Sequence, residues 1–557
     1  MNAAAPINRI PQELLSNIFA LSPGTISHGS GTRGLAYWPF EEVNVGDLPK
    51  LTKVCRYWRD LAVATPMLWN TVCTYFGDDR YSQCFRRSIY LPDDPSPDLI
   101  VHFDPDQDCT GKMVEFVVTN APKIRELHAW NMYVIPDVPS FLRSLDASAL
   151  EHCTLWDSGA KGGALVRQPS PKTRFLPFFS NDGARLRSLS LANFHILPTN
   201  DFPALTLFLI ASEYQSLITT GDLVKFLAGC PRLEEVYVYN IQQCPSHPPP
   251  ASPLISLPRL QYLSYAYRRH QRFGWEEGAD PIEYLLSRTS IPSTCHMYFT
   301  VHNGPDLSVT NRGILDTVCR HVHGKDAVSH LFIGQDESGQ TESRIQLVFS
   351  QGSLRLHLPP FDHLGIFHSF PGRLFSSTEE LRIRYTTILS HPTDSVRTLT
   401  SALPATFPNV KVLSIIPKIR CSPGNPLLHL YLAQPCQSAS AGVPETSRIP
   451  HPALDTLWIS VQSREEIPPL KATLAARASL GFPIRCLIVH HVFWADPEAL
   501  AQLQTLGAEE VIPVTEVGDT NIPTEVDLVV RIPDTFSLPT AIHRDWPTNW
   551  YTYRREK

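Results

Sequence analysis

Residues 7–21 read INRIPQELLSNIFAL, and residues 48–72 read LPKLTKVCRYWRDLAVATPMLWNTV. Both stretches have the apolar spacing of short amphipathic helices. Pro11 and Glu13 suit the first turn of a helix, because proline lacks only an unused donor there and an acid complements the positive end of the helix dipole. The apolar face of this first expected helix consists of Leu14, Leu15, Ile18 and Phe19.

The second stretch predicts a helix that begins near Pro49 and a short third helix after it. Thr65 and Pro66 provide a cap followed by proline at the first position of the third helix, which contains Met67, Leu68 and Trp69. The polar residues of the second helix, which mostly face water, are Lys53, Arg56, Arg59 and Asp60. Its apolar stripe consists of Leu51, Val54, Cys55, Trp58, Leu61 and Ala62.

Three short helices bury little surface among themselves, and a core below about 70–80 residues rarely supplies more than a few kcal/mol. We therefore expect some of these apolar side chains to pack on another protein or on the domain that follows. The same stripes are also compatible with an internal core alone, and the pattern by itself leaves both interpretations open.

The first motif, Ile-Pro-x-Glu-Leu-Leu, begins at Ile10, and the second, Val-Cys-Arg-x-Trp-Arg, begins at Val54. With the Thr-Pro-x-Leu-Trp motif from Thr65, they resemble the F-box, particularly the version in F-box proteins of mushroom-forming fungi. The resemblance covers residues 1–75 and implies a domain that docks onto the Skp-type adaptor of a cullin-based ubiquitin ligase. The residues that it implies for the docking surface or its immediate support are Ile10, Pro11, Leu14, Leu15, Ile18, Phe19, Val54, Cys55, Trp58, Leu61, Pro66, Leu68 and Trp69.

One feature departs from the usual F-box pattern. An insert of about 25 residues, 22–47, separates the first two helices, where the motif has a short turn. Long insertions at flexible connections add little loop-closure entropy, so the helices can still form.

A short apolar pattern recurs through the rest of the chain. One apolar residue is followed by others three and five positions later, and the last two alternate as in a strand with one buried face. Asn193 and Asn240 follow two of these expected strands, where asparagine can bond to backbone in a turn. The pattern occurs at Ile124-Leu127, Leu150-Leu155, Leu186-Leu189-Leu191, Leu233-Val236-Val238, Leu260-Leu263-Tyr265, Val328-Leu331-Ile333, Leu381-Ile383, Val410-Leu413-Ile415, Leu454-Leu457-Ile459 and Ile484-Leu487-Val489.

Helix-like pieces lie between the strands, such as residues 221–229, where Asp222 can cap the start and Gly229 can end the helix. This order over residues 100–500 resembles a degenerate leucine-rich repeat array. The expected fold class is α/β: a short N-terminal three-helix F-box followed by an irregular leucine-rich-repeat-like β/α solenoid. An ordinary mixed α/β domain is the alternative.

The expected domains are 1–75, with its inserted loop, then a solenoid over 76–530 and a C-terminal tail over 531–557. Closely spaced strands predict an insertion of antiparallel hairpins at 328–358. Two proline-rich stretches, 244–258 and 417–452, are expected to be exposed loops.

Composition limits the classes of function. Of the 557 residues, 43% are hydrophobic, and the net charge is −6 without a basic run, so we expect no nucleic-acid partner. The basic, aromatic tail, with Trp546 and Trp550, could stack on single-stranded bases, but we interpret it as folding back on the last repeat. The twelve cysteines form no C-x-x-C pair and are expected to be reduced. No signal peptide or membrane-spanning run is visible, so an intracellular protein of the cytoplasm or nucleus is expected.

No catalytic residue, metal or cofactor is predicted. Residues 29–34 match G-x-G-x-x-G, but a helix precedes them where a dinucleotide site needs a strand. His321, His323, His490 and His491 have no matching metal-ligand motif nearby. An enzyme with a site assembled from distant residues is the third-ranked hypothesis.

The sequence thus predicts a substrate-recognition adaptor of a Skp-cullin-F-box ubiquitin ligase. Its partners would be a Skp-type adaptor, through it a cullin scaffold, and an unidentified protein substrate, with no membrane partner. The alternative is a non-ligase scaffold for protein–protein interaction, in which the N-terminal helices cap the solenoid.

Overall fold

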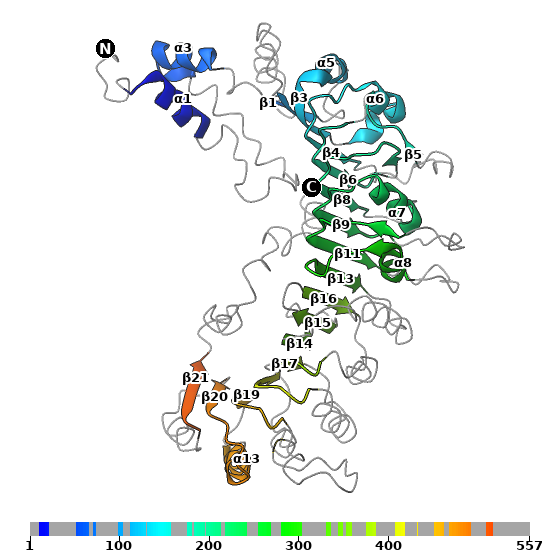
Figure 1. The fold of residues 1–557 in the computed structure, drawn as a ribbon. Helices are drawn as coiled ribbons and strands as arrows, with labels where there is room; N and C mark the ends of the chain where they lie inside the picture. Colours follow the sequence, from blue (N-terminus) through cyan, green and yellow to red (C-terminus); the bar gives the residue numbers. More distant parts are fainter. Residues whose placement is uncertain are drawn as a thin grey trace. The chain divides into compact units, whose positions relative to one another are not determined.

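The structure is a computed structural model of the whole chain. Figure 1 shows helices first and then long runs of parallel strands. The residues that the structure describes are 10–21, 52–65, 71–73, 99–103, 112–129, 131–157, 175–180, 183–194, 196–212, 218–241, 254–268, 280–302, 330–335, 343–348, 353–358, 375–385, 407–417, 432, 451–461, 467–491 and 508–515.

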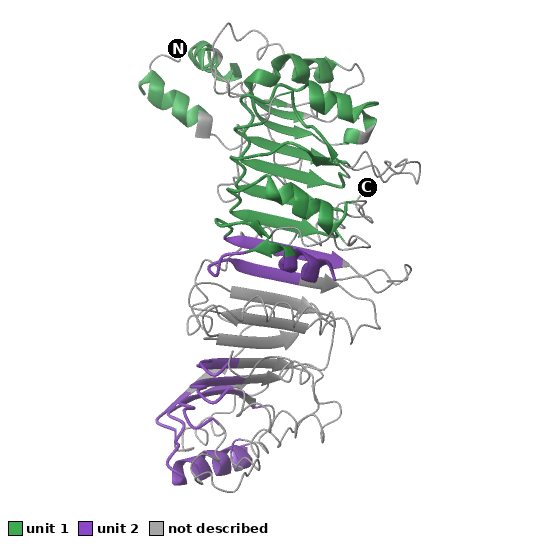
Figure 2. Ribbon diagram, turned by 45° about the vertical axis from the view of Figure 1, so that its right-hand side comes forward, with its two compact units in different colours: residues 1–260, 288–290, 537–557 green, residues 261–287, 291–536 purple. Residues whose placement is uncertain are grey.

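The chain divides into two compact units, drawn in different colours in Figure 2. Unit 1 comprises Met1–Leu260, Arg288–Ser290 and Ser537–Lys557. Unit 2 comprises Gln261–Ser287 and Ile291–Phe536.

Unit 1 begins with two short helices, and helices alternate with strands after them. A helical turn at residues 52–54 precedes the second helix. The helices are α1 (Gln12–Leu21), α3 (Arg56–Ala64), α5 (Lys112–Asn120), α6 (Val138–Ser144) and α7 (Thr220–Ala228), with 3-10 turns at η6 (Ala121–Lys123) and η7 (Met132–Val134).

The strands of unit 1 form a parallel sheet in chain order, as expected when helices connect successive strands. Short accessory pairs, β5 (Phe175–Leu176) with β7 (Leu197–Pro198) and β10 (Ile255–Ser256) with β12 (Thr289–Ser290), are also parallel. The sheet consists of β1 (Thr71–Cys73), β2 (Leu99–Phe103), β3 (Ile124–Ala129), β4 (His152–Trp156), β6 (Ser188–Ala192), β8 (Leu207–Ala211) and β9 (Glu235–Tyr239).

A ladder of apolar side chains crosses this sheet. The partners Leu127, Cys153, Leu189, Phe208 and Val236 are in register and almost fully buried. The ring of Phe208 lies 4.6 Å from that of Phe226 in α7, so the ladder is on the face that the helices cover. Figure 1 shows α5, α6 and α7 on that same side of the sheet. The recurring apolar pattern therefore corresponds to the buried face of successive strands.

Asparagines with positive φ end several strands of unit 1. Asn131, Asn193 and Asn240 have φ of 50°, 54° and 60°, a region that asparagine tolerates better than most residues. Asn240 is buried, and its Nδ2 donates to the carbonyl oxygen of Ser212 at 2.9 Å. The side chain therefore links the ends of two neighbouring strands.

Unit 2 contains a long run of strands, most of helix α8 (Pro281–Arg288) and helix α13 (Ile467–Ser479). Leu381, Leu413, Leu457 and Leu487 are in register and fully buried. The strands, in spatial order, are β11 (Tyr262–Arg268), β13 (His296–His302), β16 (Ser353–Leu358), β15 (Ser343–Val348), β14 (His330–Gln335), β17 (Glu380–Tyr385), β18 (Val412–Pro417), β19 (Thr456–Val461), β20 (Cys486–His491) and β21 (Glu510–Thr515).

One strand of this sheet runs against the others. β15 pairs antiparallel with both β14 and β16, whereas β16 is parallel to β13 and β14 is parallel to β17. These strands lie in the stretch where the sequence predicts hairpins. Between β13 and β17, the spatial order of the strands is therefore β16, β15, β14, the reverse of their order in the sequence.

A buried arginine holds the region before α13. Arg477 is fully buried, and its Nη2 donates to the carbonyl oxygen of His451 at 3.0 Å. Its Nη1 lies 3.4 Å from the carbonyl oxygen of Leu432, and Nδ1 of His451 lies 3.0 Å from that of Phe407. Leu432 and His451 are thus buried, although the sequence predicted that the stretch 417–452 is exposed.

Other local expectations also needed correction. Thr219, not Asp222, is the N-cap of α7; Asp222 completes a capping box by accepting from the Thr219 backbone at 3.0 Å. The proline-rich stretch 244–258 contains β10 at its end, where Leu257 is buried. In contrast, Gly229 ends α7 as predicted.

At this level the prediction of an α/β chain is confirmed: N-terminal helices precede a mixed α/β region with long parallel sheets. Among the described helices, none combines the length and apolarity needed to cross a bilayer. The insert 22–47, the G-x-G-x-x-G at 29–34, the third helix and the tail 531–557 lie outside the described residues.

Candidate docking surface

The N-terminal helices are fixed by local capping. The backbone N–H of Leu15 donates to Pro11 O at 3.0 Å, so Pro11 precedes the first turn of α1. In α3, Cys55 is the N-cap, and its Sγ accepts from the N–H of Trp58 at 3.4 Å. Cys55 is extended, with φ −159°, and it separates residues 52–54 from α3. The second helix that the sequence predicts from Pro49 is therefore interrupted at this cysteine.

A small core joins α1 to α3. Leu15, Phe19, Leu61 and Ala62 are almost fully buried, and the partly buried Trp58 packs against them. The rings of Phe19 and Trp58 have centroids 4.9 Å apart, inclined by 56°. Each fully buried side chain of this size contributes about 1.5–3 kcal/mol, so the pair is held mainly by a few apolar contacts.

A polar contact fixes the direction of the two helices. The hydroxyl of Thr65 donates to Leu61 O at 2.8 Å, which leaves Ser16 as the donor in the 3.3 Å contact between the two hydroxyls. Ser16 thus meets the end of α3, while Phe19, later in α1, meets Trp58 near the start of α3. The helices therefore run antiparallel.

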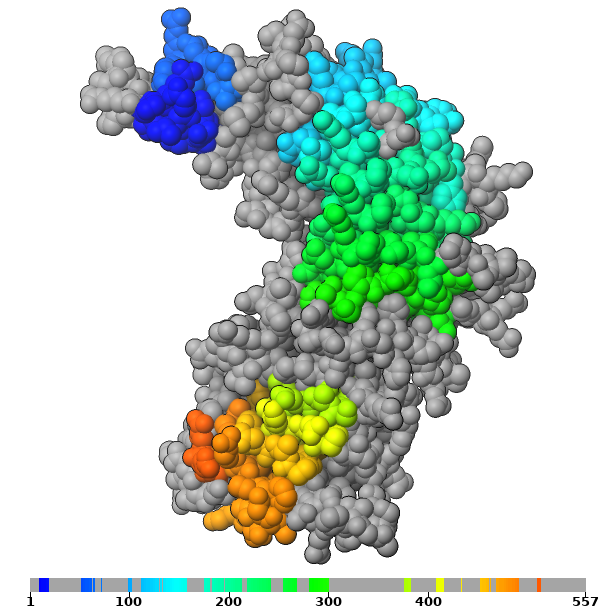
Figure 3. All heavy atoms as spheres, in the orientation of Figure 1, coloured from blue at the N-terminus to red at the C-terminus, as the bar shows by residue number. Residues whose placement is uncertain are grey.

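Apolar side chains remain outside this core. Seven large apolar side chains in the described part of the chain are exposed, and four of them are on or beside these helices. They are Leu14, Ile18, Val54 and Tyr57, with exposed fractions of 55%, 44%, 53% and 38%. Figure 3 shows α1 and α3, in blue, as one body of packed side chains.

Helix geometry brings three of these residues to one side. Successive side chains turn by about 100°, and Ile18 and Tyr57 each precede the residue that makes the ring contact, Phe19 or Trp58. Because the helices are antiparallel, the residue before Phe19 and the residue before Trp58 both lie on the same side of the helix pair. Leu14 is one turn before Ile18 and shares its side of α1. We call Leu14, Ile18 and Tyr57 the apolar face.

The residues that the F-box resemblance implied for docking fall into distinct groups. Leu15, Phe19 and Leu61 are buried, and Ile10, Cys55 and Trp58 are partly buried, which suits support of the helix pair. Pro11, Leu14, Ile18 and Val54 are exposed. Pro66, Leu68 and Trp69 lie outside the described residues.

Sequence reasoning missed two features of this surface. Tyr57 was not selected, although its position one step before Trp58 would have indicated the flank of the stripe. Thr65 was assigned to the cap of the third helix, but its hydroxyl bonds within α3 and to Ser16. The signal for that contact depends on helix pairing and is not present in the local sequence.

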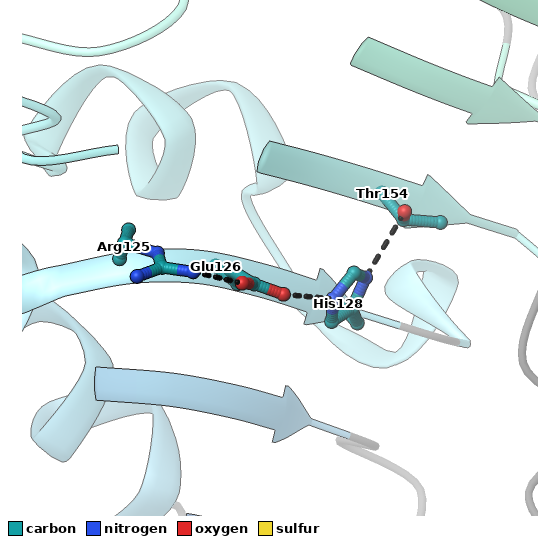
Figure 4. Close-up of polar contacts among 4 residues, drawn as sticks. All are labelled: Arg125, Glu126, His128 and Thr154. Atoms are coloured by element: carbon teal, nitrogen blue, oxygen red, sulfur yellow. Dashed lines mark hydrogen bonds and ion pairs between the residues drawn. The ribbon is translucent and has the colours of Figure 1, made fainter. Parts of the chain in front are cut away.

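A second cluster of polar groups lies in the sheet of unit 1. Oε1 of Glu126 accepts from Nη2 of Arg125 at 3.1 Å, and its Oε2 lies 3.7 Å from Nε2 of His128. Nδ1 of His128 lies 3.1 Å from Oγ1 of Thr154 (Figure 4). The ring of His128 also stacks on that of His102, with centroids 4.8 Å apart. Glu126, His128 and Thr154 are buried.

The charge of this cluster is balanced within the sheet. Burial alone would raise the pKa of Glu126, but the interaction with His128 and the charges of His152 and Arg125 outweigh it and lower the pKa to about 2. Burial lowers the pKa of His152. A buried carboxylate paired in this way is a structural ion pair rather than a proton acceptor near neutral pH.

Among the described residues, no group of three or more His, Cys, Asp or Glu side chains could hold a metal ion. His321 and His323 lie outside them, and only the backbone of His490 and His491 is described.

Comparison with known proteins adds one assignment. Residues 7–75 match the family model described as F-box-like. No curated protein matches the chain. The matched range contains α1, α3 and all the residues of the apolar face. The chain therefore carries an F-box-like domain at its N-terminal helices.

Proposed function

We propose that this protein is a substrate-recognition adaptor of a Skp-cullin-F-box ubiquitin ligase. F-box-like domains are typical of non-catalytic adaptor proteins and suggest a Skp-type partner. The observation that carries the proposal is the exposure of Leu14 and Ile18 beside a core that is complete without them.

The exposed residues suit an interface better than a free surface. Burying one such side chain contributes about 1.5–3 kcal/mol, so the apolar face gains several kcal/mol from one complementary partner. The side chains behind it, Leu15, Phe19 and Leu61, hold the helices in place. Docking thus needs both groups: the exposed residues make contact, and the buried ones present them.

The proposed organisation behind this domain is a leucine-rich-repeat-like solenoid over residues 76–530, followed by a tail over 531–557. Its support is the register of the buried ladder and the asparagines at the strand ends. Such arrays expose one face of their sheet, a common place to hold a protein target.

The proposed mechanism is proximity. The N-terminal helices fix the protein to the ligase, and the repeats hold the target where ubiquitin can reach its lysines. The contribution is a raised effective concentration, whereas other subunits form the bond. A protein of this kind works inside the cell, in the cytoplasm or nucleus.

The test is binding of the purified full-length chain to a purified Skp-type adaptor. Leu14→Ala with Ile18→Ala should weaken binding at least tenfold, since two anchors of an interface centre are removed. The matched control is Leu254→Ala with Leu480→Ala, because these leucines are exposed at 64% and 51% elsewhere. Equal binding by both double variants would reject docking through the apolar face.

The alternative, a scaffold whose helices only cap the repeats, gives a different result. In that case neither the unchanged protein nor any variant binds the adaptor. In addition, Leu14→Ala with Ile18→Ala would lower the stability of the repeat region, which circular dichroism during urea unfolding would detect.

A further inference from the structure

Arginines gather at register positions of one face of unit 2. Residues at alternate positions of a strand share a face. In β11, residues 263–267 are all buried, so burial alone does not assign the faces. The hydroxyl of Tyr267 donates to Asp280 at the start of α8, which puts Tyr267 and its alternate neighbours Leu263 and Tyr265 on the helix-bearing face. These residues mark the helix-bearing face, so Tyr262 and its alternate neighbours belong to the other face.

The strand registers extend that other face across the next strands. Tyr298 of β13 pairs with Arg355 of β16, and Arg355 pairs with Gln346 of β15. Gln346 pairs with Phe332 of β14, which pairs with Arg382 of β17. Arg355 and Arg382 are thus in one row, separated by two strands.

Neighbouring positions of the same face hold further arginines. Arg344 pairs with His357, Arg384 is two residues after Arg382, and Arg268 pairs with His302. In the described strands β11 and β13 to β17, Glu380 is the single acid at a position of this face. We define the arginine face by Arg268, Arg344, Arg355, Arg382 and Arg384.

This charge is not a general property of the fold. The corresponding face of unit 1 holds Glu126, His128 and Glu235. Arg125, at the register shift beside Glu126, donates to that carboxylate, and the described strands of that sheet hold no other lysine or arginine. The chain as a whole has a net charge of −6. A concentration of arginine within an acidic protein indicates a local requirement for an anionic partner.

We propose that the arginine face binds an acidic segment, rich in Asp and Glu, of a protein target. This deepens the proposed function, because it names the chemistry of the target on which that function rests. Arginine forms bidentate hydrogen bonds with carboxylates, which gives both affinity and orientation. Arg355 and Arg382 are three strand spacings apart, so their backbone positions are separated by about 14 Å. An extended peptide covers that distance in about four residues.

The experiment measures binding of fluorescein-labelled decaglutamate to the full chain by fluorescence anisotropy. Arg355→Glu with Arg382→Glu should weaken binding about tenfold or more, because charge-assisted hydrogen bonds are lost and repulsion replaces them. Arg355→Lys with Arg382→Lys should retain most of the affinity, and added salt should weaken it. The matched control is Lys225→Glu with Lys471→Glu, which changes net charge equally at exposed helix positions.

Several outcomes would overturn the proposal. These are no binding of decaglutamate, equal weakening by the control pair, binding of only a phosphoserine peptide of the same length, or tighter binding of oligouridylate. If circular dichroism shows that the double glutamate variant is unfolded, Arg344→Gln with Arg384→Gln takes its place. The variant Leu14→Ala with Ile18→Ala should bind the peptide normally, so failure of this proposal and failure of adaptor docking are distinguishable.

Discussion

Phe19 and Trp58 pack ring against ring across α1 and α3, with their centroids 4.9 Å apart. Phe19→Ala removes the buried half of this contact and leaves a cavity, at a cost of about 3–5 kcal/mol. The helix pair should open, and its amides should lose protection from hydrogen exchange. Protection in β3 to β8 should not change, and Leu14→Ala should have little effect because that side chain is exposed. Full protection of α1 in the Phe19 variant would contradict this packing.

Asn240 should be sensitive to replacement for two separable reasons. Its φ of 60° is costly for alanine, and its side chain donates to Ser212 O. Asn240→Ala should lower the free energy of unfolding of unit 1 by about 1–3 kcal/mol, because the side-chain hydrogen bond to the buried carbonyl is also lost. Asn240→Gly keeps the backbone conformation accessible and should cost less. Urea unfolding of both variants measures the two free energies of unfolding. An equal decrease in both would show that the positive φ does not contribute.

Gly229 is required by a close approach. An added Cβ would lie 2.4 Å from Oδ1 of Asp201 and 3.3 Å from its Cα. Gly229→Ala should therefore destabilise unit 1 by about 1–3 kcal/mol through overpacking. Combining it with Asp201→Ala removes the nearest atom and should recover part of that loss. Thermal unfolding of the two single variants and the double variant measures this coupling.

His451 should make unit 2 less stable in acid. Burial lowers the pKa of His451 to about 4, from an ordinary value of 6.5, and the nearby Arg477 acts in the same direction. The unfolded chain therefore binds this proton first, so stability falls as the pH drops from about 6.5 toward about 4. His451→Asn does not titrate, and asparagine tolerates the φ of 49°. The free energy of unfolding in urea should differ between the unchanged protein and His451→Asn by an amount that changes with pH between about 6.5 and about 4. A difference that stays constant over this range would rule out titration of His451.

Much of the sheet could be predicted because the signal is local. The alternating apolar pairs that the sequence indicates, such as Leu189 with Leu191 and Leu457 with Ile459, lie on described strands. The strand β8 was missed, although Leu205, Phe208 and Ile210 have the same spacing. Its apolar residues continue without a break on both faces, so the alternation that identifies a strand is hidden.

The features that were not predicted have two causes: competing local caps, and packing between helices. Cys55 interrupts the second helix by capping α3, although its apolar neighbours continue the helical stripe. Asp222 has the chemistry of an N-cap, but Thr219 occupies that position and Asp222 completes the box. The apolar face could not be separated from the core of the helix pair, because Ile18 and Phe19 have similar chemistry and only packing distinguishes them.

The reversed strand β15 has a consequence for how this protein can change in length. Where each strand follows its predecessor, one repeat can be duplicated or deleted and the two ends still meet in the same direction. Between β13 and β17, the chain moves out to β14 and then returns through β15 to β16. Removal of β14 or β16 alone would set the reversed β15 against β17 or β13, whereas removal of all three strands would bring β13 beside β17 in the same direction. The three strands are therefore most simply gained or lost together.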